Sequence, residues 1–143
     1  MKASSGQPEL NRSSTSYRHA IQEAMAVLNG QWVVAVLASL ADRRLKYGDL
    51  FAEINRVEER LGWMSHPRPV SQKVLSATLK RMRRDGLIIR ISEGARFSEV
   101  YYDLSPVGQE LLRALRSVAT WAIDNGEAVA RARAEADESS DEF

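Results

Sequence analysis

The amino-acid sequence contains no cysteine, so disulfides, thiolate zinc sites, iron–sulfur clusters and cysteine nucleophiles are excluded. Histidine is scarce as well: His19 and His66 are the only two, and neither belongs to a metal-ligand pattern. We interpret both as surface or loop residues and expect no metal ion or other cofactor. Long hydrophobic runs are also missing, because the longest, residues 32–38, is far shorter than the roughly 18 residues that span a membrane. We therefore expect no membrane partner.

Signatures of enzymes and of secretion are missing too. The chain has no glycine-rich phosphate loop and no nucleophile elbow. Its N-terminus, MKASSGQPELNRSSTS, lacks the apolar stretch of a secretory signal. Together with the absence of cysteine, these observations predict a cytoplasmic protein that is not an enzyme.

What the chain does contain is a hydrophobic fraction of 44% in 143 residues, which suits one domain with one core. Its net charge of +1 conceals an uneven distribution. Residues 71–96 carry seven basic side chains against two acidic ones, whereas residues 127–143 carry six acidic side chains against two arginines. A basic segment on a nearly neutral protein predicts a surface that faces a polyanion.

Hydrophobic periodicity predicts three helices in the first half of the chain, after a flexible arm over residues 1–16. An amphipathic helix is expected over residues 17–28, a buried helix over 31–41 and a third helix over 47–61. Between the last two, residues 43–46 are either a connector or a short edge strand. Glycine and two prolines predict a loop over residues 62–70.

The second half of the chain has the pattern of a helix followed by a hairpin. Ser71 is the predicted N-cap of a helix that ends near Asp85 and Gly86. Residues 87–92 and 98–105 then read as two strands on either side of a five-residue turn.

A last helix is predicted to begin at Ser105-Pro106, with serine as the N-cap and proline as the first helical residue. We expect Asn125-Gly126 to break this helix. The predicted folded domain is therefore residues 17–125, and the acidic residues 126–143 are predicted to be a mobile tail.

This order of elements is typical of a winged helix-turn-helix, in which a basic helix is followed at once by a hairpin. The fold class that we predict is α+β and mainly helical, with a two- or three-stranded wing and terminal dimerisation helices. At about 100° per residue, the helix that follows Ser71 places apolar side chains on one face and small or basic side chains on the other. Such a division lets one face hold the helix to a core while the other meets DNA.

We therefore predict sequence-specific binding of double-stranded DNA, with this helix in the major groove and residues 87–104 near the minor groove. Lys73, Ser76 and Ala77 are expected to read base edges, and the others mainly to contact the backbone. A basic helix face that is merely solvated is the alternative, and the adjacent basic hairpin argues against it. The predicted DNA-binding residues are Lys46, Ser71, Gln72, Lys73, Ser76, Ala77, Lys80, Arg83, Arg84, Arg90 and Arg96.

Apolar residues at both ends of the domain exceed what its small core needs and predict a homodimer. The alternative for Trp121 is packing against the first helix of its own chain. The predicted interface residues are Tyr17, Ile21, Met25, Leu28, Leu115, Val118, Trp121 and Ala122.

Four motifs, in order, resemble those of HxlR-type winged-helix transcription regulators. Asn29-Gly30-Gln31-Trp32 resembles their G-x-W opening, and Tyr47-Gly48-Asp49-Leu50 resembles their F-x-E-L motif. Residues 71–88 are similar to their recognition helix, and residues 102–108 to their Y-x-L-T-P-x-G passage out of the wing. The resemblance covers about residues 20–124. It implies a homodimeric DNA-binding regulator of bacterial type, with dimer contacts from the first and last helices.

Two departures from the family pattern affect the functional prediction. Many members sense oxidants through a cysteine before the first helix, and this property does not carry over to a chain without cysteine. The turn before the recognition helix is longer here, and Trp63, Met64 and Pro67 either line a small-molecule pocket or cover the end of the third helix. Two alternatives therefore stand beside the main prediction: a regulator that responds to a small-molecule effector, and a winged-helix module that binds a protein instead of DNA.

Overall fold

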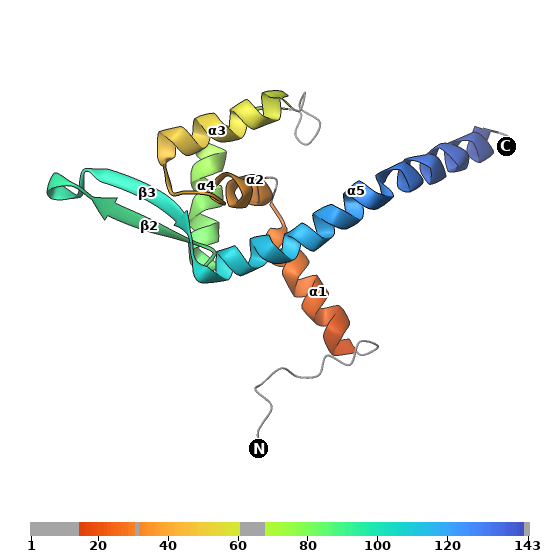
Figure 1. The fold of residues 1–143 in the computed structure, drawn as a ribbon, viewed down its shortest axis with the longest axis horizontal. Helices are drawn as coiled ribbons and strands as arrows, with labels where there is room; N and C mark the ends of the chain where they lie inside the picture. Colours follow the sequence, from red (N-terminus) through yellow and green to blue (C-terminus); the bar gives the residue numbers. More distant parts are fainter. Residues whose placement is uncertain (1–14, 31, 61–67, 142–143) are drawn as a thin grey trace, which may run out of the picture.

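The computed structural model describes residues 15–30, 32–60 and 68–141. Figure 1 shows a group of short helices beside a projecting hairpin, with one long helix leaving the group on the opposite side. In chain order the elements are α1 (Thr15–Leu28), α2 (Val33–Ser39), β1 (Leu45–Lys46), α3 (Tyr47–Arg60), α4 (Gln72–Arg84), β2 (Ile88–Glu93), the 3₁₀ turn η1 (Ala95–Phe97), β3 (Glu99–Leu104) and α5 (Pro106–Asp141).

The strands form a three-stranded antiparallel sheet in the order β1-β3-β2. The hairpin predicted from the alternating sequence is present, and Ile88 lies opposite Leu104 at its base. Leu45 and Lys46 pair with Tyr102 and Tyr101, so the segment before α3 is an edge strand rather than a connector. The predicted fold class, mainly helical with a small wing, is confirmed.

The hydrophobic core lies where α2, α3 and α4 meet the base of the sheet. Val36, Leu37, Leu50 and Leu75 are fully buried. Burying a side chain of this size contributes about 1.5–3 kcal/mol. The apolar stretch predicted to be a buried helix is helical. Helix α2 is shorter than the predicted range 31–41, and its C-cap is Leu40.

Side-chain caps define the ends of the elements that form the wing and its helix. The Ser71 hydroxyl accepts a hydrogen bond from the Val74 N–H at 3.1 Å, as an N-cap does. Gly86 follows α4 with φ of 77°, a left-handed conformation that glycine adopts without strain. The predicted cap of α5 is also present, because the Gly108 N–H donates to the Ser105 hydroxyl at 3.0 Å.

The predicted helix break at Asn125-Gly126 is wrong, since α5 runs without interruption to Asp141. The Asn125 side-chain amide donates to the Trp121 carbonyl one turn earlier and so supports the helix that it was expected to end. A single glycine costs a helix only about 1 kcal/mol, and the alanine-rich sequence after it has high helix propensity. Residues 126–141 are therefore a continuation of α5 rather than a separate tail.

The N-terminal boundary also differs from the prediction. Helix α1 begins at Thr15, two residues earlier than expected. The rest of the predicted arm, residues 1–14, lies outside the described residues. Within the described residues, no single helix is long and apolar enough to cross a membrane, and only α1 and α2 together, bent by 78°, reach that length and composition.

Replacing Gly108 by alanine is expected to destabilise the protein by more than about 2 kcal/mol. A Cβ at Gly108 would lie 2.0 Å from the backbone carbonyl oxygen of Leu87, so the first turn of α5 would have to move away from β2. Urea denaturation followed by circular dichroism measures the loss. Gly126→Ala is the matched control, because nothing lies within 4 Å of its Cβ position. This variant should gain about 0.5–1 kcal/mol, and a comparable loss in both variants would contradict the packing argument.

Candidate nucleic-acid interface

Helix α4 has two faces of opposite character. Leu75, Leu79 and Met82 are buried against the core. The other face carries the predicted base-reading and phosphate-binding side chains, all of them exposed: Lys73, Ser76, Ala77, Lys80, Arg83 and Arg84. The burial pattern confirms the predicted amphipathic division for Leu75, Leu79 and Met82 and leaves a cationic face open to solvent, although Val74, an apolar residue of the same helix, is 42% exposed.

A groove runs along the exposed face of α4 beside the sheet. One part of it is lined by Tyr47, Gln72, Lys73, Ser76, Leu79, Lys80, Arg83 and Tyr102. A second hollow, towards the C-terminal end of α4, is lined by Lys80, Arg83, Arg84, Ile88, Ile89 and Arg90. Lys80 and Arg83 line both hollows, so the cationic side of α4 adjoins the base of the hairpin.

Tyr47, the first residue of the motif that resembles F-x-E-L, is a site residue that the sequence analysis did not assign to the interface. Its hydroxyl donates to the Gln72 carbonyl at 3.0 Å and lies 3.2 Å from the Ser76 hydroxyl. The first residue of α3 thereby holds the first turns of α4 and orients Ser76. No local sequence pattern signals this contact, because the partners are 25 and 29 residues away.

Arg81 differs from the other cations of α4. Its guanidinium donates to the carbonyls of Ala26 and Val27, at 2.9 and 3.4 Å. These carbonyls belong to the last turn of α1, and the Ala26 carbonyl also accepts a hydrogen bond from the Asn29 N–H at 3.2 Å. Arg81 therefore fastens α1 to α4, and its absence from the predicted DNA-binding set is consistent with this inward position.

The sheet also has two distinct faces. Opposed residues in antiparallel strands point to the same side, so Leu45, Tyr102 and Arg90 share one face. Lys46 and Tyr101 lie on the other. Arg90 therefore points to the side on which Tyr102 borders the groove, whereas Lys46, a predicted DNA-binding residue, is not brought together with the cations of α4.

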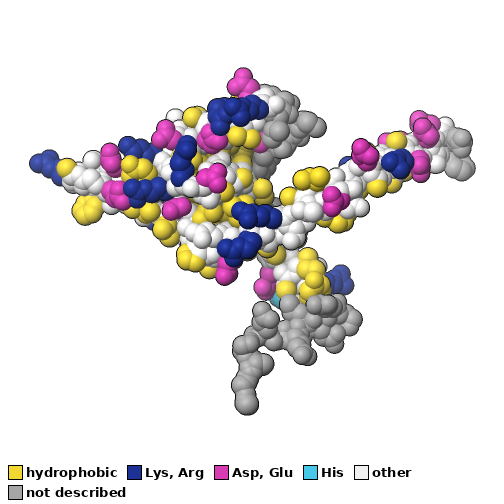
Figure 2. Space-filling view, viewed as in Figure 1, with side chains coloured by type: hydrophobic (Ala, Val, Ile, Leu, Met, Phe, Trp, Pro, Cys, Tyr) yellow, Lys and Arg dark blue, Asp and Glu magenta, His cyan; other side chains and the backbone are white. Residues whose placement is uncertain are grey.

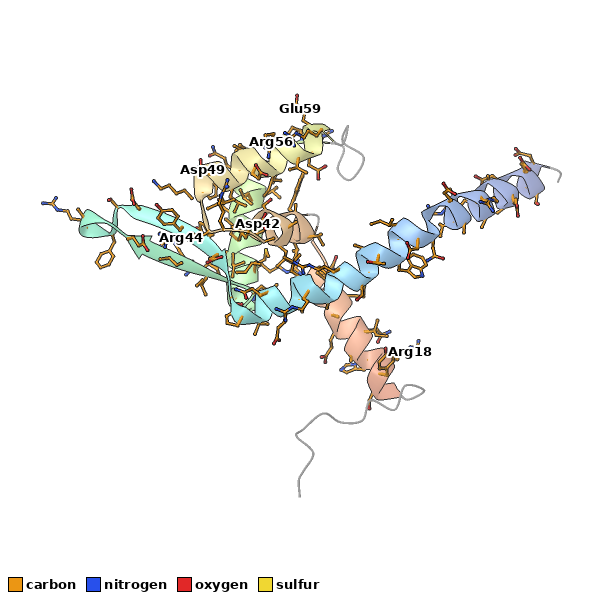
Figure 3. All side chains as sticks on the ribbon, viewed as in Figure 1. Arg18, Asp42, Arg44, Asp49, Arg56 and Glu59 are labelled. Atoms are coloured by element: carbon orange, nitrogen blue, oxygen red, sulfur yellow. The ribbon has the colours of Figure 1, made fainter. Side chains whose placement is uncertain are left out.

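An ion-pair network covers this second face of the sheet. Arg44 donates two parallel hydrogen bonds to the Glu93 carboxylate, at 2.6 and 2.8 Å. Its guanidinium also stacks 4.2 Å from the ring centroid of Tyr101 on the strand between them. Lys46 pairs with Glu99 at 3.5 Å. Figure 3 shows Arg44 against the hairpin. These contacts connect the chain before β1 to the far end of β2 and brace the wing.

The turn at the end of the hairpin holds the last predicted cation. Arg96 is exposed and has φ of 59°, so its backbone is left-handed. Together with Arg90, it extends the basic surface from α4 towards the tip of the wing.

The predicted interface residues fall into two groups. Leu28 and Leu115 are partly buried and pack against the core of their own chain. The remaining six are exposed: Tyr17, Ile21, Met25, Val118, Trp121 and Ala122. Trp121 is 60% exposed and so does not fold back on the first helix of its own chain. Figure 2 shows apolar side chains along the projecting α5, with acidic side chains gathered towards its C-terminal end.

A helix-turn-helix core followed by a β-hairpin, with a cationic second helix facing outwards, defines a winged helix-turn-helix protein. Residues 27–130 match the HxlR-like helix-turn-helix family, and the chain belongs to this family. The resemblance seen in the sequence motifs is thereby confirmed.

Individual relatives agree with this assignment. The chain is 25% identical over 118 residues to the HTH-type transcriptional regulator YdzF of Bacillus subtilis (strain 168), a match that covers 82% of this chain and 96% of YdzF. It is 25% identical over 100 residues to the HTH-type transcriptional regulator YtfH of Escherichia coli (strain K12), covering 70% and 69% of the two chains. The crystal structure of a MarR-family transcriptional regulator from Enterococcus faecalis V583 superposes with a TM-score of 0.67 at 26% identity, over 85% of this chain and 98% of that one.

Acidification is expected to break the ion pair between Arg44 and Glu93 that braces the wing. The hydrogen bonds from Arg44 hold the pKa of Glu93 below its usual range, and Glu93 in turn raises the pKa of Arg44. Because the folded-state pKa of Glu93 is lowered, the stabilisation is complete above the unfolded value of about 4.3 and is lost as the pH falls through the folded value. An NMR titration should show the Glu93 carboxyl carbon and the amides of β2 and β3 changing together below that pH.

Glu93→Gln should abolish this titration of the wing amides. Glu53→Gln is the matched control, because the pKa of Glu53 is also lowered by hydrogen bonds from an arginine, Arg56, but on α3 (Figure 3). Wing amides that still titrate in Glu93→Gln, or cease to titrate in Glu53→Gln, would refute the assignment.

Proposed function

We propose that this protein is a cytoplasmic, non-enzymatic transcriptional regulator that binds double-stranded DNA sequence-specifically as a homodimer. Helix α4 lies in the major groove, and the wing formed by β2 and β3 lies near the adjacent minor groove. The observation that carries the proposal is the cationic surface from the outer face of α4 to Arg90 on the hairpin. Membership of a helix-turn-helix family supports it.

The side chains on α4 suit two different tasks. Ser76 and Ala77 are small and exposed, so the helix can approach base edges closely, and the Ser76 hydroxyl can bond to a base while an alanine methyl contacts a thymine methyl. Lys73, near the N-terminal end, reaches a base acceptor or a phosphate. Lys80 and Arg83 lie further along the groove and contact the phosphate backbone, which supplies affinity without reading sequence.

The N-terminus of α4 supplies a further phosphate contact. Ser71 caps this end, and the first backbone N–H groups of a helix have no partner within it. The helix dipole also favours an anion there. Ser71 and Gln72 are exposed, so a phosphate oxygen can approach both.

The homodimer is proposed from the pattern of α5. Residues spaced alternately by three and four positions form one stripe along the helix, as in a coiled-coil seam: Leu115, Val118, Ala122, Asn125, Val129, Ala132 and Ala136. Val118 is 57% exposed, and the exposed ring of Trp121 borders the stripe. A contiguous apolar surface of this kind marks an interaction site.

Asn125 is the one polar residue of this stripe and lies at its middle. A polar Asn at one seam position specifies register in coiled coils.

A dimer also explains how a protein of this size binds DNA with the affinity that a transcriptional regulator needs. A single winged module buries little DNA surface, and regulatory affinities are reached by larger or paired modules. Two copies of α4 related by a two-fold axis can contact half-sites about 34 Å apart, one turn of the double helix.

Binding to duplex DNA tests the main proposal directly. Gel-shift experiments with DNA flanking the gene of this protein, and selection from a random duplex library, should yield a preferred, roughly palindromic sequence. Lys73→Ala and Ser76→Ala should reduce the preference for that sequence over random DNA. Lys80→Ala and Arg83→Ala should weaken binding to both equally, and each should flatten the log–log dependence of affinity on salt by about 0.9.

Arg81→Lys is the internal control, since Arg81 contacts α1 and keeps its charge in this variant. Its salt dependence should be unchanged. If the protein captured only acidic proteins and no duplex, it would be an interaction module instead, and the proposal would fail. Unchanged sequence preference in Lys73→Ala combined with Ser76→Ala would refute the role given to α4.

The dimer should dissociate more readily when its seam is altered. Ala122→Glu and Trp121→Ala are expected to raise the dissociation constant at least about tenfold, since aromatic anchors typically contribute 2 kcal/mol or more. Ile123→Ala, a change at the most exposed large hydrophobic residue of α5, lies outside the seam and should have little effect. Analytical ultracentrifugation measures the mass and the dissociation constant.

A monomer that binds a palindromic duplex as tightly as a dimer would argue against the whole arrangement.

A further inference from the structure

The tip of the wing exposes a large aromatic side chain. Phe97, in the turn between β2 and β3, is 72% exposed. Among the described residues, the only large hydrophobic side chain with a greater exposed fraction is Ile123. Phe97 contributes nothing to the core, so folding gives no reason for a phenylalanine at this position.

The backbone of the tip is strained in a way that presents this ring. Arg96 and Phe97 have φ of 59° and 54°, and within the described residues they are the only non-glycine residues with positive φ. The left-handed region is a genuine outlier for a bulky residue and is energetically costly. Glycine or asparagine would relieve the strain. Residues held in such sparsely populated backbone conformations cluster at functional sites.

The turn itself is well ordered by backbone hydrogen bonds. The Phe97 N–H donates to the Gly94 carbonyl at 3.1 Å, and the Ser98 N–H donates to the Ala95 carbonyl at 3.2 Å. Gly94, with φ of 85°, supplies the conformational freedom that begins the turn. The aromatic ring is therefore carried on a defined turn, next to a cation.

The wing is long enough to bring this ring to the minor groove. Six residues in each strand, at about 3.3 Å per residue, extend the hairpin by about 20 Å. The minor groove lies about half a helical turn, or about 17 Å, from the adjacent major groove. Arg90 points to the α4 side of the sheet, so the hairpin follows the same face of a duplex that α4 contacts.

The wing is also braced along its length. Arg44 donates paired hydrogen bonds to Glu93 across β3, and its guanidinium stacks on the ring of Tyr101 in that strand. This brace connects the end of β2 nearest the turn to the chain before β1. It opposes bending of the hairpin when the tip meets DNA.

From these features we propose that Phe97 is a wedge that enters the minor groove, inserts partly between two base pairs and kinks the DNA towards the major groove. Arg96 beside it holds the flanking phosphates. Apolar wedges of this kind unstack one step and bend a duplex by about 20–90°. The preferred target is a flexible pyrimidine–purine step, which therefore contributes to sequence selection without hydrogen bonds to its bases. This inference rests on the proposed DNA-binding function.

The bend is measurable with the full-length protein and a duplex of about 30 base pairs chosen by selection from a random library. Dyes at the two ends report the end-to-end distance by energy transfer, and permanganate oxidation reports unstacked thymines. The wild-type protein should shorten the duplex and create one reactive thymine in each half-site. Phe97→Gly removes the ring and relieves the backbone strain. It should lose both signals and weaken binding about tenfold, close to the loss for one unfavourable base pair.

Three further variants distinguish the effect of the Phe97 ring from the effects of other residues. Phe97→Leu retains an apolar wedge and should keep most of the bend. Arg96→Ala should reduce the salt dependence of binding while keeping the reactive thymine. Val107→Ala, at an exposed apolar position at the start of α5, should change nothing.

The outcomes distinguish this inference from the function on which it rests. Specific binding by Phe97→Gly with an unchanged bend and unchanged thymine reactivity would overturn the wedge and leave the regulator intact. A wild-type protein that binds without bending would do the same. Absence of any duplex binding by the wild-type protein would instead refute the proposed function.

Discussion

The whole structure depends on one close backbone contact, between the first turn of α5 and the start of β2. Gly108 lies so near the Leu87 carbonyl that no side chain fits between them. Ser105 completes the junction: its N–H donates to the Leu87 carbonyl, and its hydroxyl donates to the Gly86 carbonyl and accepts from the Gly108 N–H. The end of α4, both hairpin strands and the start of α5 therefore meet at one rigid point. In the proposed dimer, α5 is therefore joined directly to the helix and the wing that are proposed to contact DNA.

The basic side chains fall into separate groups on different surfaces of the protein. The cations of α4 and Arg90 face the groove with no acidic residue in its lining. Arg44 and Lys46 lie on the opposite face of the sheet, where Glu93 and Glu99 neutralise them and the pairing serves to hold the strands. Arg81 is used inside the fold, on the carbonyls at the end of α1. Basic side chains thus have three roles: they line the groove, hold the strands together or join α1 to α4. The partners around each side chain determine which role it has.

Local sequence was sufficient for most elements because their signals are local. Ser71 and Ser105 have the composition of N-caps, Gly86 ends a helix, and the alternating strands surround a glycine turn, so the caps and the hairpin were predicted correctly. The break at Asn125-Gly126 was wrong for an equally physical reason. A turn-forming pair is only a weak helix terminator when the asparagine side chain bonds back to Trp121 and alanines follow. The left-handed backbone at Arg96 and Phe97 was not predicted, because nothing in their side chains favours that conformation.

The sequence by itself determined which residues form an amphipathic basic helix, where a hairpin follows it and to which family the pattern belongs, since these properties reside in spacing along the chain. Only the tertiary structure decided what each polar side chain does. It placed Tyr47 on Gln72 and Ser76, turned Arg81 inwards, and set Lys46 and Arg90 on opposite faces of one sheet. Those assignments depend on contacts between residues 12 to 57 positions apart. Periodicity within a single element carries no information about such contacts, because the crossing of helices and the register of strands arise only when the core is packed.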